Sequence, residues 1–179
     1  MMIWEFIAKH EFLATWLNLV VDVIFGLLVL WEFKYLRHEA KEKKQQHIQK
    51  LIYELCARVV WCLIEICDKK FKTSSIKSIY DILHDDRGIN VKIIDGICKK
   101  TKLNEQFVKY VIKSIDKEHN KMYRINYVSI KEVLIEDKNR MRNGTFYASD
   151  IIVERLRKCF KNDKEIERLY KYQILIKQL

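Results

Sequence analysis

The sequence predicts an all-α protein, in which a single N-terminal transmembrane helix continues into a cytoplasmic helical bundle that assembles as a homo-oligomer. Three observations support this fold class. The 179 residues include no proline and only four glycines, which disfavours many-stranded sandwiches and barrels. Residues 12–31 form one long apolar stretch. After it, apolar residues recur with the i, i+3, i+4 spacing of amphipathic helices.

The composition is that of a folded, basic protein. Hydrophobic residues make up 49% and aromatic residues 12% of the chain, enough apolar surface to drive folding. The 34 Lys and Arg exceed the 24 Asp and Glu, for a net charge of +10. The cysteines are odd in number and lack zinc-site or Cys-x-x-Cys spacing, which indicates reduced thiols without disulfides or metal: Cys56, Cys62, Cys67, Cys98 and Cys159. No glycine-rich phosphate loop, GxSxG or HExxH motif occurs, so we expect no cofactor, no metal and no catalytic residues.

Residues 12–31 are long and apolar enough to span a bilayer. Sixteen of these twenty residues are apolar, and the helix they form is roughly 30 Å long. These apolar residues contribute roughly −6 kcal/mol to the free energy of membrane insertion, and Asp22 opposes insertion by about 3 kcal/mol. No small-residue cleavage site follows, so the segment predicts an uncleaved anchor. We therefore expect residues 1–33 to form a transmembrane, pore-lining helix and residues 34–179 a cytoplasmic basic domain.

The flanking charges predict the orientation. Lys9 is the one Lys or Arg before the apolar stretch, whereas six follow it closely: Lys34, Arg37, Lys41, Lys43, Lys44 and Lys50. The positive-inside rule places the N-terminus outside and the remainder in the cytoplasm. Residues 1–31 carry a net −2, so the other 148 residues carry +12. Such basicity suits contact with anionic lipid headgroups or with RNA.

Polar residues within the apolar stretch share one helix face. Thr15, Asn18, Asp22 and Gly26 fall within about 80° of one another at 100° per residue. A carboxylate facing lipid costs several kcal/mol, and self-association would turn this stripe toward neighbouring helices or water, with Gly26 allowing close packing. We therefore expect a homo-oligomer with Asp22 near its axis. A large ring would form an aqueous pore; the alternative is a small bundle with a buried, protonated Asp22.

The remaining elements follow from periodicity and capping residues. Nothing interrupts a helix from 32 to about 71, where apolar residues keep helical spacing. Further helices are predicted near 75–84, 90–100, 104–118, 145–161 and 163–177, with a turn at 85–88. Asn162 or Asp163 is the expected cap of the last helix.

The helices at 90–100 and 104–118, separated by TKLN, have the spacing of a helix-turn-helix. Apolar and polar residues alternate over residues 122–130, which predicts a wing strand. In a DNA-binding protein Gln106, Lys109, Tyr110 and Lys113 would face DNA. The alternative is a helical bundle that merely contains this turn.

The string Arg142-Asn143-Gly144-Thr145-Phe146-Tyr147 resembles the Arg-Asn-x-x-x-His motif of HEPN domains, helical bundles that often act as ribonucleases. In that family the Arg and His act on the scissile phosphate and the Asn polarises the site. Here Tyr147 takes the histidine position, and a tyrosine hydroxyl, with an ordinary pKa of about 10, cannot replace histidine as a base. We therefore expect a degenerate, non-enzymatic HEPN-like site. The alternative is a surface loop with a helix cap.

An N-terminal anchor, a basic helical domain and this HEPN-like string together resemble the small membrane accessory proteins encoded beside the RNA-guided ribonuclease of type VI-B CRISPR systems. The resemblance implies an oligomeric pore in the bacterial inner membrane. Such a pore would enhance antiviral defence by depolarising the cell after the ribonuclease cuts viral RNA. A second hypothesis is a membrane-anchored sensor whose helical domain binds nucleic acid or a nucleotide messenger, and a third is a tethered ribonuclease.

Overall fold

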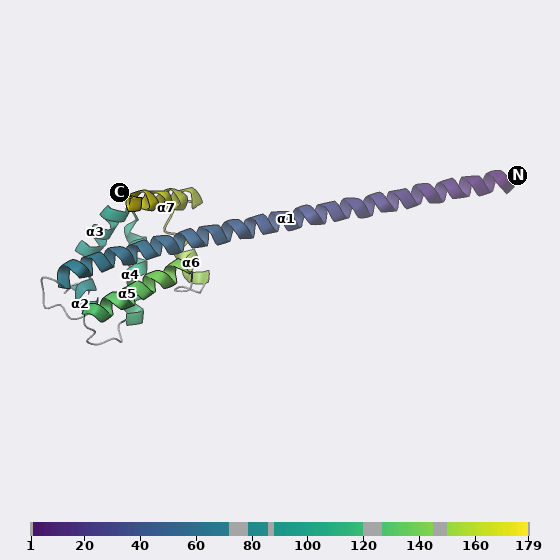
Figure 1. Ribbon diagram of the computed structural model, residues 1–179. Coiled ribbons are helices and arrows are strands. Elements are labelled where there is room, and N and C mark those ends of the chain that lie inside the picture. Colours follow the sequence, from purple (N-terminus) through teal and green to yellow (C-terminus); the bar gives the residue numbers. More distant parts are fainter. Residues whose placement is uncertain (1, 72–78, 86–87, 120–126, 145–149, 179) are drawn as a thin grey trace. The chain divides into compact units, whose positions relative to one another are not determined.

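The computed structural model describes residues 2–71, 79–85, 88–119, 127–144 and 150–178. These residues are almost entirely helical (Figure 1), which confirms the predicted all-α class, whereas oligomerisation stays a prediction. The elements are α1 (Met2–Phe71), α2 (Ile79–Leu83), β1 (His84–Asp85), β2 (Gly88–Ile89), α3 (Val91–Thr101), α4 (Glu105–His119), α5 (Tyr127–Arg142), α6 (Asp150–Arg157) and α7 (Asp163–Gln178).

The chain divides into two compact units, Met1–Gln45 and Gln46–Leu179, which we call unit 1 and unit 2. Unit 1 consists of the first part of α1, and the side chains of residues 2–14 and 17 lie outside the described set. Its large apolar side chains from Leu19 to Leu36 are 41–69% exposed. Among the side chains that the structure describes, none of the helices combines the length and apolar character needed to cross a membrane.

Unit 2 has one hydrophobic core, and the second part of α1 supplies much of it. Between Ile48 and Cys67 this helix buries residues at helical spacing, as the sequence predicts: Ile48, Leu51, Ile52, Leu55, Cys56, Val59, Val60, Leu63, Ile64 and Cys67. The core is completed by residues of the later helices, among them Phe107, Val111, Leu134 and Ile166. Apolar burial of this extent is the main stabilising contribution to unit 2.

The α3–α4 hairpin forms as the sequence predicts, with a side-chain cap at each helix start. The Asn90 side chain accepts the backbone N–H groups of Lys92 and Ile93 at 3.0 and 3.4 Å. Asn104 accepts the N–H of Phe107 at 2.8 Å. Between the helices Lys102 adopts the left-handed conformation, with φ of 58°. Phe107 then packs on Phe160, with ring centroids 5.1 Å apart.

The predicted turn at 85–88 lies within a minimal hairpin. His84 pairs with Ile89 and Asp85 with Gly88 in antiparallel register, while residues 86–87 lie outside the described residues. Gly88 has a backbone φ of +103°, a conformation that residues other than glycine rarely adopt.

The wing strand expected at 122–130 is wrong over residues 127–130, which begin α5; residues 122–126 lie outside the described residues. The physical reason is the buried face of α5, where Leu134, Asp137 and Met141 follow one another at helical spacing. Because the buried Asp137 interrupts the apolar periodicity of this face, the sequence pattern does not indicate the helix.

Helix α7 agrees with the prediction, whereas α6 ends four residues earlier than expected, because residues 158–161 form a turn and a bend. Helix α6 covers Asp150–Arg157 of the expected 145–161, and residues 145–149 lie outside the described part. Asn162 is the cap of α7, because its side chain accepts the N–H of Glu165 at 3.0 Å. Asp163 instead forms a bidentate ion pair with Arg157, at 2.7 and 3.0 Å from Nη2.

Replacing Lys102 by glycine is predicted to stabilise unit 2. A non-glycine residue in the left-handed region carries a conformational cost of about 1–2 kcal/mol, and glycine at this position removes most of it. We expect Lys102→Gly to raise the free energy of unfolding by about 0.5–1 kcal/mol in urea titrations followed by circular dichroism. Lys99→Gly, inside α3, is the control and should lower it by about 1 kcal/mol. Destabilisation by Lys102→Gly would contradict the observed backbone geometry.

Candidate functional site

The four residues of the predicted polar stripe lie on α1 within unit 1. Thr15, Asn18, Asp22 and Gly26 are all exposed in the single chain. A methyl group placed at Gly26 would meet nothing within 4 Å. These four positions therefore share one accessible helix face in the single chain.

The HEPN-like residues are only partly brought together. Arg142 ends α5, and its Nε lies 3.5 Å from a carboxylate oxygen of Glu54 on α1. Asn143 is exposed, and its backbone N–H donates to Asn139 at 3.0 Å. Tyr147 lies outside the described residues. The structure thus draws Arg142 toward α1 and places Asn143 in the turn after α5.

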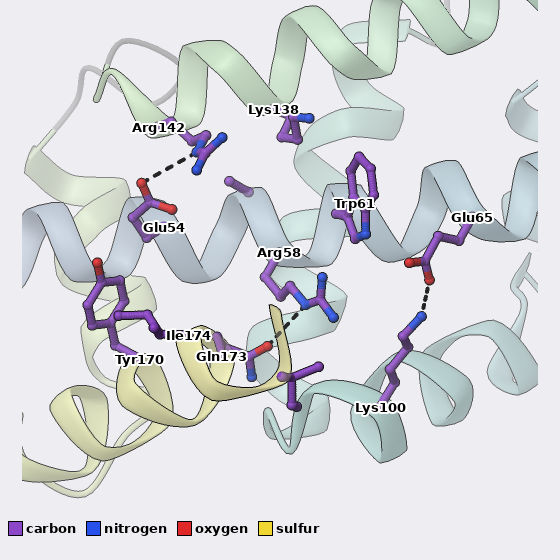
Figure 2. Close-up of a pocket in the computed structure, with 12 residues that line it drawn as sticks. Glu54, Arg58, Trp61, Glu65, Lys100, Lys138, Arg142, Tyr170, Gln173 and Ile174 are labelled. Carbon is purple, nitrogen blue, oxygen red and sulfur yellow. Dashed lines mark hydrogen bonds and ion pairs between the residues drawn. The ribbon is translucent and has the colours of Figure 1, made fainter. Parts of the chain in front are cut away.

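Arg142 lines a pocket of about 660 Å³ within unit 2. Figure 2 shows α5 on one side of α1 and α7 on the other, with Lys100 of α3 approaching from below. The α1 side of the pocket is a stripe with the i, i+3, i+4, i+7 spacing of one helix face, which Glu65 extends by one turn: Glu54, Ala57, Arg58, Trp61 and Glu65. The other helices add Lys100, Lys138, Arg142, Tyr170, Gln173, Ile174 and Ile176.

The central polar group of this pocket is the Arg58 guanidinium. Arg58 is 7% exposed, and its Nε donates to Oε1 of Gln173 at 3.1 Å (Figure 2). Gln173 is also buried, and its amide donates to the backbone carbonyl of Thr101 at the end of α3. This chain of hydrogen bonds joins α1, α7 and α3. It satisfies the Gln173 amide and the Thr101 carbonyl, two groups that would destabilise unit 2 if left unpaired.

The other charges of the pocket are arranged as pairs around Arg58. Lys100 pairs with Glu65, and Arg142 pairs with Glu54 (Figure 2). Lys138 lies over the Trp61 ring, with its Nζ 4.6 Å from the ring centroid, a favourable cation–π geometry. Four basic and two acidic side chains line the pocket, so its formal net charge is +2.

The residues predicted to face DNA lie together on a second surface of unit 2. Gln106, Lys109, Tyr110 and Lys113 line a hollow of about 680 Å³ along α4. Lys161, Glu105 and Glu165 also line this hollow, so three basic and two acidic side chains give it a net charge of +1, and Glu105 pairs with Lys109. The carboxylates offset much of the positive charge that phosphate contacts would require. The helical-bundle and the DNA-binding interpretations of this hairpin both stay predictions.

All five cysteines are free thiols, and three of them are buried. Burial raises the pKa of Cys62 to about 11 and that of Cys67 to about 12, and it raises the pKa of Cys56 as well. Within the described ranges, no cluster of three or more His, Cys, Asp and Glu side chains could hold a metal ion. Thiols with raised pKa values are poor nucleophiles near neutral pH.

No family model, curated protein or solved structure matches this chain.

Sequence reasoning missed most of the pocket. Arg58, Trp61, Lys138 and Gln173 were not singled out, and only Arg142 was. The available signal was the spacing of Glu54, Arg58 and Trp61, which places three polar or amphipathic residues on one face of an otherwise apolar helix. That signal indicates a polar cleft, but it does not identify the helices across it.

Replacing Gln173 by leucine is predicted to destabilise unit 2. The change leaves the Nε of Arg58 and the carbonyl of Thr101 without their shared partner in a buried site. We expect a loss of about 1–3 kcal/mol in unfolding free energy, measured by urea titration. Gln106→Leu on the exposed face of α4 is the control and should change stability by less than about 0.5 kcal/mol. Equal stability of the two variants would show that the bridge contributes nothing.

Thiol labelling provides a separate check on the core. At pH 8, burial and the raised pKa values should keep Cys56, Cys62 and Cys67 protonated and unreactive toward iodoacetamide in the folded chain. Cys98 and Cys159 are only partly buried and should be labelled first. Peptide mapping by mass spectrometry measures the order, and denaturation in urea should equalise all five rates. Labelling of Cys56 ahead of Cys159 in the folded chain would contradict the described packing.

Proposed function

We propose that this chain is a membrane-anchored effector that self-associates through its N-terminal helix. The observation that carries the proposal is the exposure of the large apolar side chains between Leu19 and Leu36. They occur at nearly consecutive positions and so point to every side of α1. A helix that is apolar all round needs cover from lipid or from other helices, and residues 12–31 have the length of a hydrocarbon core.

The polar stripe determines which face of α1 meets the other copies in the proposed assembly. Asp22 stands among exposed apolar side chains, with Asn18 and Gly26 one turn away on the same face. In lipid, this face is the costly one, and pairing it with the same face of other copies removes the cost. A ring of copies around Asp22 would line an aqueous pore, and a small bundle would bury it without a lumen.

The basic flank supports the proposed orientation. Lys34, Arg37 and Lys41 are exposed directly after the apolar segment, where the positive-inside rule assigns the cytoplasmic face. Unit 2 then lies in the cytoplasm, and the N-terminus lies outside the bacterial inner membrane. Anionic headgroups would attract this flank by about 1 kcal/mol for each basic residue near the surface.

The resemblance to accessory proteins of type VI-B CRISPR systems extends the proposal to antiviral defence. In that role the assembly depolarises the inner membrane and slows metabolism after an RNA-guided ribonuclease has cut viral RNA. The partners are then other copies of this chain, the lipid bilayer and, functionally, that ribonuclease. The chain itself acts without catalysis, because Tyr147 stands at the histidine position of the HEPN-like string.

The first test is the detergent-corrected mass of the purified full-length protein, followed by ion flux in liposomes. We expect a defined ring of about five or more subunits, which leaves room for water along the stripe. Asp22→Leu should lower the flux at least about tenfold, because it removes the charged group that faces the lumen.

The matched control is Val23→Leu, which changes the adjacent position about 100° around the helix and should leave flux within about twofold. A monomer or dimer in detergent would contradict the pore. Undiminished flux in Asp22→Leu liposomes would contradict the role of the stripe even if the ring forms.

A further inference from the structure

The Arg58 guanidinium is a buried charge without a carboxylate partner among the described residues. Its hydrogen-bond partner among these residues is the neutral amide oxygen of Gln173, which accepts from Nε alone. The two Nη nitrogens have no hydrogen-bond acceptor within the part of the chain that the structure describes. Buried charges are normally paired because desolvation costs several kcal/mol. An anion in the adjoining pocket would supply the missing partner.

The surrounding charges favour an anion more strongly than Arg58 alone. Lys138 and Arg142 stand four positions apart on the same face of α5, and Lys100 reaches the pocket from α3 (Figure 2). Glu65 pairs with Lys100 and Glu54 pairs with Arg142, and neither carboxylate is paired with Arg58. Arginine binds phosphate through two parallel N–H donors, and Arg58 still offers such a pair.

The pocket also has a flat, apolar part. The Trp61 ring is 38% exposed and forms the wall below Lys138. Tyr170 and Ile174 of α7 line the pocket as well. An aromatic ring that already attracts a cation can instead stack with a planar base. The volume of about 660 Å³ falls within the range of about 300–1,000 Å³ that is usual for small-molecule sites.

We propose that this pocket binds a nucleoside phosphate, with the phosphate on Arg58 and Arg142 and the base beside Trp61. Every residue involved belongs to unit 2, so this inference goes beyond the membrane role and does not depend on it. The ligand would bridge α1 and α5, the helices that carry the two arginines. Gln173 positions the Arg58 guanidinium for this contact.

The test is isothermal titration of full-length protein in phosphate-free detergent buffer with ADP, glycerol 3-phosphate and inorganic phosphate. We expect ADP to bind at least about tenfold more tightly than the other two, because only ADP has a base to place beside Trp61. Arg58→Gln and Arg142→Gln should each weaken ADP binding about tenfold or more, as expected for a charge-assisted hydrogen bond of 1.5–3 kcal/mol.

Arg140→Gln is the matched control. It lies on α5 two positions from Arg142, pairs with Glu136 at 2.9 Å and does not line the pocket, so it should bind ADP as the parent protein does. Arg142 is partly exposed, and its variant keeps the test informative if Arg58→Gln fails to fold. Absence of ADP binding by the parent protein would overturn the proposal. So would equal affinity for inorganic phosphate, or an Arg142→Gln variant that binds like Arg140→Gln.

Discussion

The second part of α1 must serve two environments at once, and the organisation of unit 2 depends on how it does so. Most of its surface between Ile48 and Cys67 is covered by apolar side chains of the later helices. One stripe, containing Arg58 and Trp61, is instead left toward the pocket. A helix wrapped almost completely would tolerate only apolar residues. The charge at Arg58 therefore requires the neighbouring helices to leave space and to provide Gln173 as an acceptor.

Local signals in the sequence were sufficient for much of this helical framework. The start of α7 follows from Asn162, whose side chain caps the helix regardless of what packs on it. The α3–α4 hairpin follows from apolar periodicity on either side of a short polar turn. In each case the determining interaction joins residues close in sequence, so a pattern within a few residues contains the needed information.

The elements that were missed depend on contacts between distant residues. Helix α5 buries Asp137 beside Leu134 and Met141, and a buried carboxylate breaks the apolar period from which helices are recognised. The pocket is harder still, because Arg58 and Gln173 are 115 residues apart. No motif spacing unites them. The HEPN-like string identifies Arg142 in the sequence. Its pairing with Glu54 joins residues 88 positions apart and depends on how α5 packs beside α1.

Asp22 in unit 1 and Arg58 in unit 2 raise the same question of how a charge away from water is compensated. Neither has a charged partner among the described residues, and a charge that leaves water without one costs several kcal/mol. For Arg58 the burial is observed; for Asp22 it follows from the proposed membrane. Leucine at either position would avoid the cost of removing an unpaired charge from water. A chain that keeps both charges is explained if each meets a partner that a single chain lacks: further copies or water at Asp22, and an anion at Arg58.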